Sequence, residues 1–340
     1  MLSLRLIPVT LKFRSTFRIS RETKDSNESL VVAISDGIHT GYGEAASHRY
    51  YQKTISGLSA SFEKCRAFLL GVDDYHPEEL WPKLLQLTDG DIFALSALDN
   101  ALWDLWGRRQ GKPLFECWGL SIDQNVASDI TIGIGPIEEM VEKLNEYSGW
   151  PIYKIKLGTT DDIAIMRALR ERTDAVLRVD ANCAWSAETG AAHAEALAAL
   201  DVEFIEQPLK ADDWVGMKTL HSSSSLPLIA DESCVVEEDV ERCAEVFDGI
   251  NIKLMKCGGL TPARRMISRA RELNLSVMVG CMSESTVGMS AIAQILPLLD
   301  AVDMDGAALI SNDPADGVRV EQGACRYPDR NGLGILFPRG

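Results

Sequence analysis

From about residue 123 to residue 310, short strand-like runs alternate with segments of helical periodicity, such as Ala164–Arg172 and Ser186–Leu200. The strand-like runs are Asp129–Ile134, Ile152–Leu157, Val176–Asp180, Glu203–Ile205, Pro227–Ala230, Gly249–Met255, Ser276–Val279 and Ala301–Met304. Steady alternation of strand and helix predicts parallel strands whose faces are covered by other elements. Eight such strands in roughly 180 residues favour a compact (β/α) barrel over an open doubly wound sheet, which stays as the alternative.

The region before residue 123 has a different pattern. Leu2–Phe13 alternates between polar and apolar residues, Ser29–Ser35 is rich in β-branched residues, and Gly41–Ala45 reads as a third short strand. Helical periodicity follows from Thr54 to Gly119, and Ala94–Gly107 is apolar on nearly all sides, so that helix should be buried. We therefore predict an α+β domain over 1–122, a barrel over 123–310, and a tail over 311–340 that returns to the first domain.

Charge and cysteine content exclude several classes of protein. The 340-residue chain has a formal net charge of −16, which argues against binding to nucleic acid or to anionic membranes. Its eight cysteines form no Cys-x-x-Cys pair and do not resemble a disulfide scaffold. The start of the chain has no basic head followed by a long apolar stretch, and no apolar run reaches the 18 or so residues of a membrane span. We expect a cytoplasmic protein.

Three consecutive strands of the predicted barrel end in a carboxylate: Asp180, Glu206 and Asp231. Function sits at this end of barrel strands, and neighbouring strands lie about 5 Å apart, so the three acids should converge. One such acid alone is most often a helix cap or an ion-pair partner. Three together would repel strongly unless a cation lies between them, and ligation by oxygen alone suits Mg²⁺ better than zinc.

Lysines occupy the walls around this point. Lys154 and Lys156 share one face of the second strand, and Lys253 lies on the sixth, four strands away in a ring of eight. Lys156 and Lys253 should therefore flank a substrate from opposite sides, one removing an α-proton and the other delivering one. Lys154 should depress the pKa of Lys156 and touch the substrate carboxylate. Lys256 has the opposite parity to Lys253, so we expect it to face outward or into a loop.

These residues, in this order, resemble the enolase superfamily, specifically its muconate-lactonizing-enzyme subgroup. The motifs that carry the resemblance are Gly41-Tyr-Gly-Glu-Ala, Ala97-Leu-Asp-Asn-Ala-Leu-Trp-Asp, Lys154-x-Lys156, Asp180-x-Asn182, Glu206-Gln-Pro, Ala230-Asp-Glu-Ser and Asn251-Ile-Lys253. The resemblance covers essentially the whole chain. It implies a modified TIM barrel, (β/α)7β, with an α+β capping domain formed by the N-terminal region and the C-terminal tail. It also implies one Mg²⁺ per subunit on Asp180, Glu206 and Asp231, with Lys156 and Lys253 as the acid/base pair.

The eighth strand suggests the reaction. Asp303 and Asp305 share a face at the mouth of the barrel and need a cation, for which a substrate α-ammonium is the obvious candidate. This Asp-x-Asp is similar to the motif of dipeptide epimerases such as L-Ala-D/L-Glu epimerase. A dianionic succinyl substrate would be repelled by the same acids. The alternative is that either aspartate caps a helix or pairs with an arginine.

Further substrate contacts are expected from Glu284, which could equally support the site from behind, and from two capping-domain loops, Phe17–Arg21 and His48–Gln52. Related epimerases place an arginine near the first loop to bind a side-chain carboxylate. Arg21 is the candidate here and Arg18 the alternate, although this loop reads Thr16-Phe17 where the family usually has Pro-Phe.

We therefore predict a Mg²⁺-dependent dipeptide epimerase, with an Ala-Glu dipeptide from murein peptide turnover as the leading substrate and a homo-oligomer as the expected assembly. The alternatives within the subgroup are an o-succinylbenzoate synthase, an N-succinylamino acid racemase or a muconate cycloisomerase. A further alternative, of a different class, is a non-catalytic metal-binding barrel. Three buried amines argue against it, because burying them without a role is costly.

Overall fold

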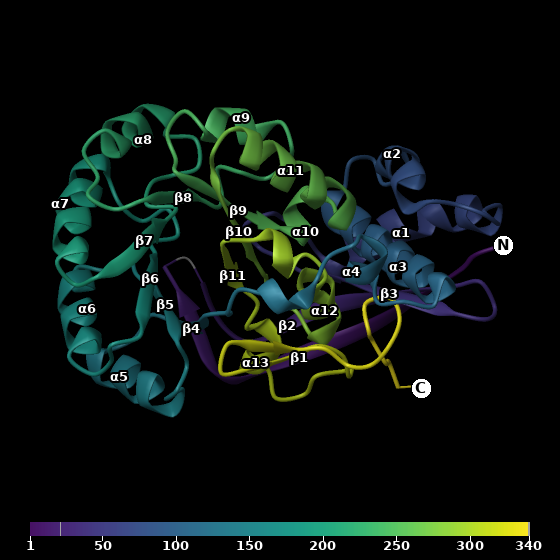
Figure 1. The fold of residues 1–340 in the computed structure, drawn as a ribbon, viewed down its shortest axis with the longest axis horizontal. Coiled ribbons are helices and arrows are strands. Elements are labelled where there is room, and N and C mark those ends of the chain that lie inside the picture. The colour runs from purple at the N-terminus through teal and green to yellow at the C-terminus, as the bar shows by residue number, and fades with distance from the viewer. Residues whose placement is uncertain (21, 339–340) are drawn as a thin grey trace.

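The computed structural model describes residues 1–20 and 22–338. Within them lie a three-stranded antiparallel sheet of order β1-β2-β3, an eight-stranded parallel sheet that runs in sequence order from β4 to β11, and a two-stranded sheet (Figure 1). The predicted TIM-type barrel with a separate α+β part is therefore confirmed, and the open doubly wound sheet is wrong. None of the helices in these residues is both long and apolar enough to cross a membrane.

The N-terminal part packs helices against its antiparallel sheet. Its elements are β1 (Ser3–Ile19), β2 (Glu22–Ser35), β3 (Thr40–Ala46), α1 (Ile55–Leu70), α2 (Pro77–Leu87), α3 (Ile92–Gln110) and α4 (Leu114–Cys117). Helix α3 is buried almost throughout and lies directly on β3, as its apolar sequence predicts. A Cβ added to Gly43 would lie 2.0 Å from the carbonyl oxygen of Ala97. Only glycine allows this close approach, which explains the Gly-x-Gly sequence of β3.

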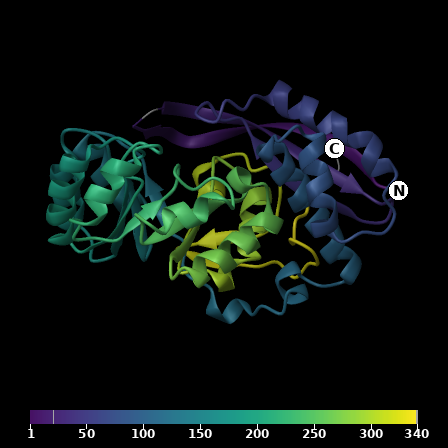
Figure 2. The same cartoon turned by 90° about the horizontal axis from the view of Figure 1, so that it is seen from above.

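The hairpin of β1 and β2 is much longer than the sequence predicts. Pairing continues to Ile19 and Glu22, with an irregularity between Lys12 and Phe17. Residues 14–28 are mostly polar and lack a clear alternation, which is why the strands could not be followed through them. Figure 2 shows this hairpin extending across the barrel, so that its far end lies over the barrel mouth.

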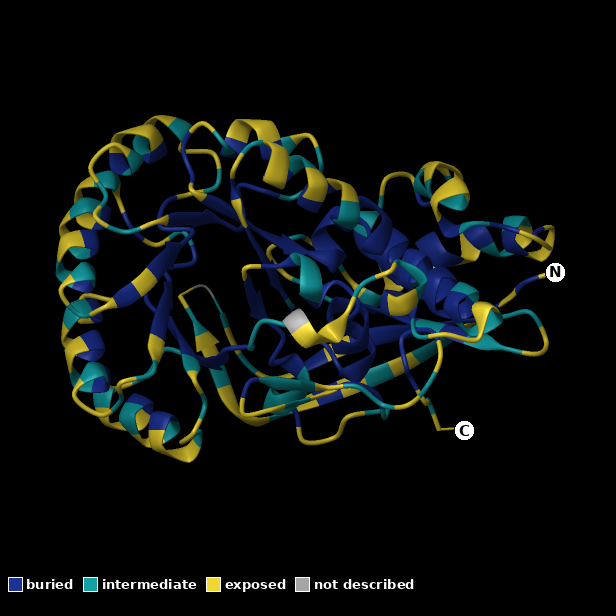
Figure 3. Ribbon diagram, in the orientation of Figure 1, coloured by how far each residue is buried: buried dark blue, intermediate teal, exposed yellow. Residues whose placement is uncertain are grey.

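The barrel strands are β4 (Ile130–Ile132), β5 (Ile152–Lys156), β6 (Val176–Asp180), β7 (Val202–Glu206), β8 (Leu228–Ala230), β9 (Gly249–Lys253), β10 (Ser276–Gly280) and β11 (Ala301–Asp303). A bridge between Ser128 and Val302 closes the ring from β11 to β4. The helices outside it are α5 (Ile137–Glu146), α6 (Asp162–Arg170), α7 (Ala187–Ala198), α8 (Trp214–His221), α9 (Asp239–Cys243), α11 (Leu260–Glu272) and α12 (Thr286–Ala293). Except for α12, which is buried throughout, these helices turn buried residues toward the strands and exposed residues outward (Figure 3).

Short elements connect or follow these. They are the 3₁₀ helices η1 (Ile122–Gln124) and η2 (Leu296–Leu298), the one-turn helices α10 (Leu254–Cys257) and α13 (Gly306–Leu309), and strands β12 (Arg319–Glu321) and β13 (Ala324–Arg326). The C-terminal segment contacts both parts of the molecule. Asn312 exchanges hydrogen bonds with the backbone of β1, whereas the carbonyl of Gly323 accepts from the Ser128 N–H at the start of the barrel.

Candidate active site

Three carboxylates meet at the carboxyl ends of adjacent barrel strands. Asp180 ends β6, Glu206 ends β7, and Asp231 directly follows β8. One oxygen from each lies within 4.8 Å of the others, and all three side chains are buried. The strands carry them to one point because parallel strands of a barrel end at the same rim.

Each acid of this cluster has a cationic or amide partner. Lys156 Nζ donates to Asp180 Oδ2 over 2.6 Å, and Lys253 Nζ donates to Asp231 Oδ2 over 2.7 Å. Glu206 is held by Asn251, whose Nδ2 donates to Oε1 over 2.8 Å. Burial raises the pKa of all three acids, but the nearby lysines lower it below its usual range for Asp180 and well below for Asp231. For Glu206, burial and the charge of Asp180 prevail and raise the pKa to about 7.

Lys154 is buried among the acids of the site. Its side chain is fully buried, and its Nζ lies 2.7 Å from Glu206, 2.8 Å from Asp303 and 3.5 Å from Asp180. Burial favours the neutral amine, but the surrounding acids outweigh it and raise the pKa of Lys154 well above its usual value. Lys154 therefore neutralises acids of the site, and a contact with a substrate carboxylate stays a prediction.

The expectation for Lys256 is wrong. The strand ends at Lys253 and the chain turns at once into α10, so the two-residue alternation of a strand does not apply to Lys256. Its side chain is fully buried, and its Nζ donates to Asp231 Oδ1 over 2.6 Å and to the carbonyl of Cys234 over 2.9 Å. Asp231 is thus held by two lysines, one on each carboxylate oxygen.

The three-acid cluster fits Mg²⁺. It offers carboxylate oxygens alone, without histidine or cysteine, and oxygen is the donor that Mg²⁺ prefers. Three acids this close repel one another, and lysines offset that charge in the structure described here. A divalent cation would provide the same compensation at the centre of the cluster.

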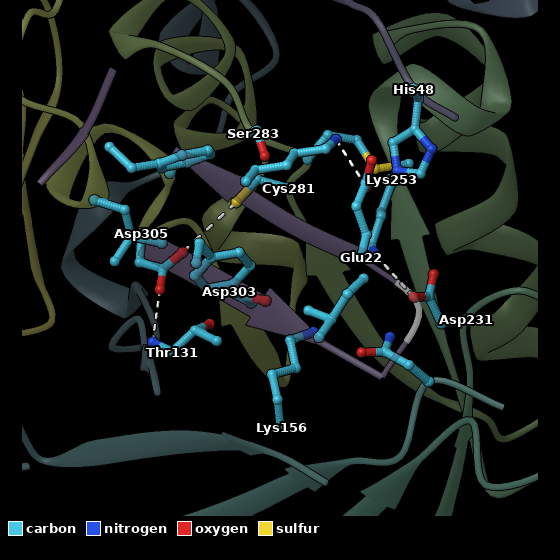
Figure 4. A pocket seen from close by; sticks show the side chains of 18 of the residues that line it. Glu22, His48, Thr131, Lys156, Asp231, Lys253, Cys281, Ser283, Asp303 and Asp305 are labelled. Carbon is cyan, nitrogen blue, oxygen red and sulfur yellow. Dashed lines mark hydrogen bonds and ion pairs between the residues drawn. The ribbon is translucent and has the colours of Figure 1, made fainter. Parts of the chain in front are cut away.

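A pocket above the cluster is lined by both the barrel and the N-terminal part. Lys156, Asp231 and Lys253 reach it from the barrel, while His48 and Glu22 reach it from the N-terminal part (Figure 4). In this view Lys156 and Lys253 enter from opposite sides. Both lysines are buried but retain 8% exposure, whereas Lys154 and Lys256 have none. Of these four barrel lysines, the two predicted to transfer protons are therefore the two that line the pocket.

A second cluster, of two aspartates and a cysteine, lines another side of the pocket. It consists of Asp303 at the end of β11, Asp305 at the start of α13, and Cys281 after β10. Lys154 donates to Asp303 Oδ2, and the N–H of Thr131 donates to Asp305 Oδ2 over 2.6 Å. Lys154 therefore supplies part of the positive charge that Asp303 was predicted to need, and a substrate α-ammonium as the partner of both aspartates stays a prediction.

The two aspartates differ in protonation. Burial raises the pKa of Asp303, but Lys154 and Lys156 outweigh it and bring the pKa to about 2. Burial and the charge of Asp303 raise the pKa of Asp305 to about 7. Among the described residues, Asp303 Oδ1 is buried and accepts no hydrogen bond from a fixed donor, although the protonated carboxyl group of Asp305 hydrogen-bonds to the Asp303 side chain. A donor with positive charge would satisfy this oxygen.

The remaining predicted substrate contacts have different outcomes. Glu284 does not line the pocket. It is buried behind the turn at 281–283 and accepts a hydrogen bond from the Met282 N–H over 2.8 Å. Burial and the neighbouring Glu44 raise the pKa of Glu284 to about 8. Arg21 lies outside the described residues, and Arg18 forms a surface ion pair of 3.7 Å with Glu139.

Sequence reasoning missed two charged residues of the pocket, Glu22 and Lys24 on β2. Their side chains form an ion pair of 2.9 Å over the barrel mouth. The signal that could have found them is their spacing of two, which places both on one face of a strand once residues 22–35 are recognised as a continuous strand.

Comparisons with known proteins match the whole length of the chain. Residues 1–119 match the N-terminal domain of the mandelate racemase / muconate lactonizing enzyme family. An L-Ala-D/L-amino acid epimerase from Maribacter sp. is 50% identical over 329 residues, covering 96% of this chain and 97% of that protein. An enzyme of the same name from Flavobacterium johnsoniae is 48% identical over 327 residues, with the same coverage of both chains.

A solved structure agrees in fold. The dipeptide epimerase of Enterococcus faecalis, in complex with Mg and the dipeptide L-Leu-L-Tyr, superposes with a TM-score of 0.89 and 31% identity, and 98% of each chain is covered. Residues 137–338 match the family described as Enolase C-terminal domain-like. The resemblance inferred from the motifs is confirmed: this chain belongs to the enolase superfamily, in the branch of mandelate racemase and muconate lactonizing enzyme.

Proposed function

We propose that this protein is a Mg²⁺-dependent dipeptide epimerase that inverts the α-carbon of the C-terminal residue. One observation carries the proposal above all others. Lys156 and Lys253 come from strands four apart in a ring of eight, and both reach one pocket above a cluster of three carboxylates. Two amines on opposite sides of one carbon are what inversion of that carbon requires.

The lysines exchange protons with the α-carbon. One takes the α-proton from one face as a neutral amine, and the other, as an ammonium, delivers a proton to the opposite face. The roles reverse for the opposite stereoisomer. Mg²⁺ held by Asp180, Glu206 and Asp231 supplies positive charge that stabilises the negative charge developing on the substrate carboxylate. Lys156 and Lys253 are paired with Asp180 and Asp231, so each lysine would be released from its acid if that acid held Mg²⁺.

Lys154 and Lys256 position the acidic side chains of the site. Lys154 bridges Glu206 and Asp303, and so connects the metal cluster to the acidic group on β11 and α13. Lys256 fixes Asp231 from the side opposite Lys253. Neither lysine lines the pocket, so we assign both to positioning and charge balance.

Asp303 and Asp305 receive the α-ammonium of the dipeptide. Both aspartates line the pocket, and Asp305, whose pKa is raised to about 7, gains a full negative charge when it loses its proton. An N-succinyl substrate would bring a carboxylate to these acids instead. This charge arrangement favours a dipeptide over the o-succinylbenzoate, N-succinyl and muconate substrates of related enzymes, and a binding barrel without catalysis would not need the paired lysines.

The names of the two relatives extend the substrate beyond Ala-Glu. Both are called L-Ala-D/L-amino acid epimerases, so we propose L-Ala-Xaa dipeptides with varied C-terminal residues, with murein peptide turnover as a source. We also propose that residues 1–122 and 311–340 form the capping domain over a barrel of 123–310. A cytoplasmic homo-oligomer is the proposed form, which light scattering of the purified protein tests.

Deuterium uptake tests the activity directly. The Mg²⁺-loaded protein is incubated in D₂O with a set of L-Ala-L-Xaa dipeptides, and mass spectrometry follows the gain of one mass unit at the C-terminal residue. Chiral chromatography of the hydrolysed product then shows whether the D-isomer accumulates. Deuterium uptake together with the D-isomer supports the proposal, whereas the absence of both in all dipeptides rejects it.

A further inference from the structure

The far end of the β1–β2 hairpin presents one face to the pocket. Phe17, Ile19, Glu22 and Lys24 all line it, and we call these four residues the hairpin wall. In the strand register Ile19 lies opposite Glu22, and Phe17 lies opposite Lys24. Directly opposite residues in a strand pair point to the same face, so the wall combines an apolar strand edge with a charged one.

The charged edge of the hairpin wall has no net charge. Glu22 Oε2 and Lys24 Nζ are 2.9 Å apart, and their side chains are only 20% and 17% exposed. Within the described residues, Lys24 is the only cation within 4.0 Å of Glu22.

Lys24 also donates to Asn27 Oδ1 over 3.3 Å. Asn27 is itself buried and donates to the carbonyls of Ser47 and Ser283, so it ties the hairpin to the barrel. Asn27 therefore holds Lys24, and with it the Glu22–Lys24 ion pair, in a fixed position over the pocket.

The position of the hairpin wall determines which part of the substrate it contacts. On the proposed function, the substrate carboxylate points to the metal cluster and the amide nitrogen points toward Asp303 and Asp305. The α-proton faces Lys156 or Lys253. The fourth substituent, the C-terminal side chain, is left to the wall that the N-terminal part supplies above the pocket.

We infer that the Glu22–Lys24 pair recognises charged C-terminal side chains of both signs, so that acidic and basic L-Ala-Xaa dipeptides are both substrates. This inference rests on the proposed function and adds its substrate class. An acidic side chain approaches Lys24, and a basic one approaches Glu22. Each member of the pair offsets the repulsion that the other would exert on the wrong charge, while Phe17 and Ile19 contact the methylene groups that both kinds of side chain share.

The inference makes the two charges separable by mutation. Removal of the Glu22 charge leaves Lys24 alone and favours acidic substrates. Removal of the Lys24 charge leaves Glu22 alone and favours basic ones. Glu22→Gln and Lys24→Gln are matched changes, because each replaces a charged group by the same neutral amide, which can still donate and accept hydrogen bonds.

The experiment measures kcat/KM for L-Ala-L-Glu and L-Ala-L-Lys, each normalised to L-Ala-L-Met, by deuterium uptake in D₂O. In the unmodified protein we expect the Glu/Lys ratio to lie within tenfold of unity. Glu22→Gln should raise this ratio about tenfold and Lys24→Gln should lower it about tenfold, the size expected for one partly buried charge contact. The exchanged variant Glu22→Lys/Lys24→Glu should return it to within threefold of the original. Lys64→Met, which removes an exposed pair with Asp89, is the control.

The following results would overturn the inference. A starting ratio beyond tenfold, single variants that move the ratio by less than threefold, or two variants that move it in one direction each overturn the inference alone. If no dipeptide takes up deuterium, the proposed function fails and the inference fails with it. Circular dichroism establishes that each variant is folded. A loss of all three activities in both folded variants also counts against the inference, because it indicates a purely structural pair.

Discussion

Lys156 and Lys253 lie on strands four apart, yet each donates a hydrogen bond to an acid of the same cluster, Asp180 and Asp231 respectively. This relationship places one amine on each side of the space above the cluster. It also means that neither amine can replace the other, because each approaches from its own wall.

The first prediction follows from that separation. Lys156→Ala or Lys253→Ala should lower epimerisation about a thousandfold, the middle of the range for loss of a general acid or base. Each variant should still exchange the α-proton of one stereoisomer with solvent deuterium, since the remaining lysine reaches one face. Proton NMR of L-Ala-L-Met and L-Ala-D-Met in D₂O measures both. Full turnover in either variant would contradict the two-base assignment.

The second prediction concerns the metal. Mg²⁺ at about 100 times its Kd should stabilise the folded protein by about 2.7 kcal/mol, which appears as a rise in the midpoint of thermal unfolding. Asp180→Asn removes one oxygen charge from the cluster and should abolish most of this rise. Asp89→Asn, at an exposed pair, should retain it. Calorimetric titration of the metal-free protein measures the affinity for Mg²⁺ independently. An unchanged affinity for Mg²⁺ in Asp180→Asn would contradict the assignment of Asp180 as a ligand.

The third prediction concerns pH. Asp305 has a pKa of about 7 because burial and Asp303 oppose its charge, and Cys281 and the Thr131 N–H also face it. Binding of a substrate ammonium favours the ionised form, so KM should fall as pH rises from about 6 to 8. Above that range the peptide amine itself deprotonates, with a pKa of about 8. Asp305→Asn should raise KM and flatten this profile, whereas a fall in KM of unchanged size in the variant would contradict the role.

The fourth prediction concerns Lys256. Its ammonium is fully buried and donates to Asp231 and to the carbonyls of Cys234 and Asn251. Lys256→Met leaves these acceptors without their donor, and we expect a loss of about 3–5 kcal/mol in the free energy of unfolding. Urea unfolding measures it. Lys64→Met on the surface should change the same quantity by no more than about 0.5 kcal/mol, and a loss that small for Lys256→Met would show that water replaces its contacts.

The fifth prediction concerns Glu284. Because burial and Glu44 raise its folded pKa from 4.5 to about 8, the folded state holds a proton that the unfolded state releases. Its contribution to stability is present below pH 4.5 and is lost as pH rises through about 8. Glu284→Gln keeps the neutral shape, so the unmodified protein should lose stability relative to this variant between those values. Parallel curves of unfolding free energy against pH would refute the raised pKa.

Much of the site could be predicted because it lies on regular elements. The positions of Asp180, Glu206 and Asp231 follow from strand ends that repeat along the chain, and the opposed placement of Lys156 and Lys253 follows from strand order alone. These arguments need only the alternation of strands and helices and the period of two within a strand.

Other parts depend on where a strand stops. Lys256 was misplaced because β9 ends at Lys253 and a helical turn of only four residues, Leu254–Cys257, begins there, too short to show a helical period in the sequence. Lys154 has the predicted face but lies deeper than Lys156, so its partners include Asp303 from the far end of the chain. Sequence patterns do not encode depth within a barrel.

The hairpin wall escaped prediction for a different reason. Glu22 and Lys24 lie in a polar stretch whose strand character comes from pairing with β1, not from its own residues. Their place above the barrel mouth follows from tertiary packing, through contacts such as those of Asn27.

The hydrogen bonds of Asn27 to Ser47 and Ser283 join two parts of the chain that are far apart in sequence. They fix the β1–β2 hairpin relative to the barrel residues that line the pocket. The hairpin itself contributes none of the three acids of the metal cluster. Substitutions in the hairpin wall can therefore change the lining of the pocket while Asp180, Glu206 and Asp231 keep their places on the barrel, as long as the Asn27 amide retains its contacts.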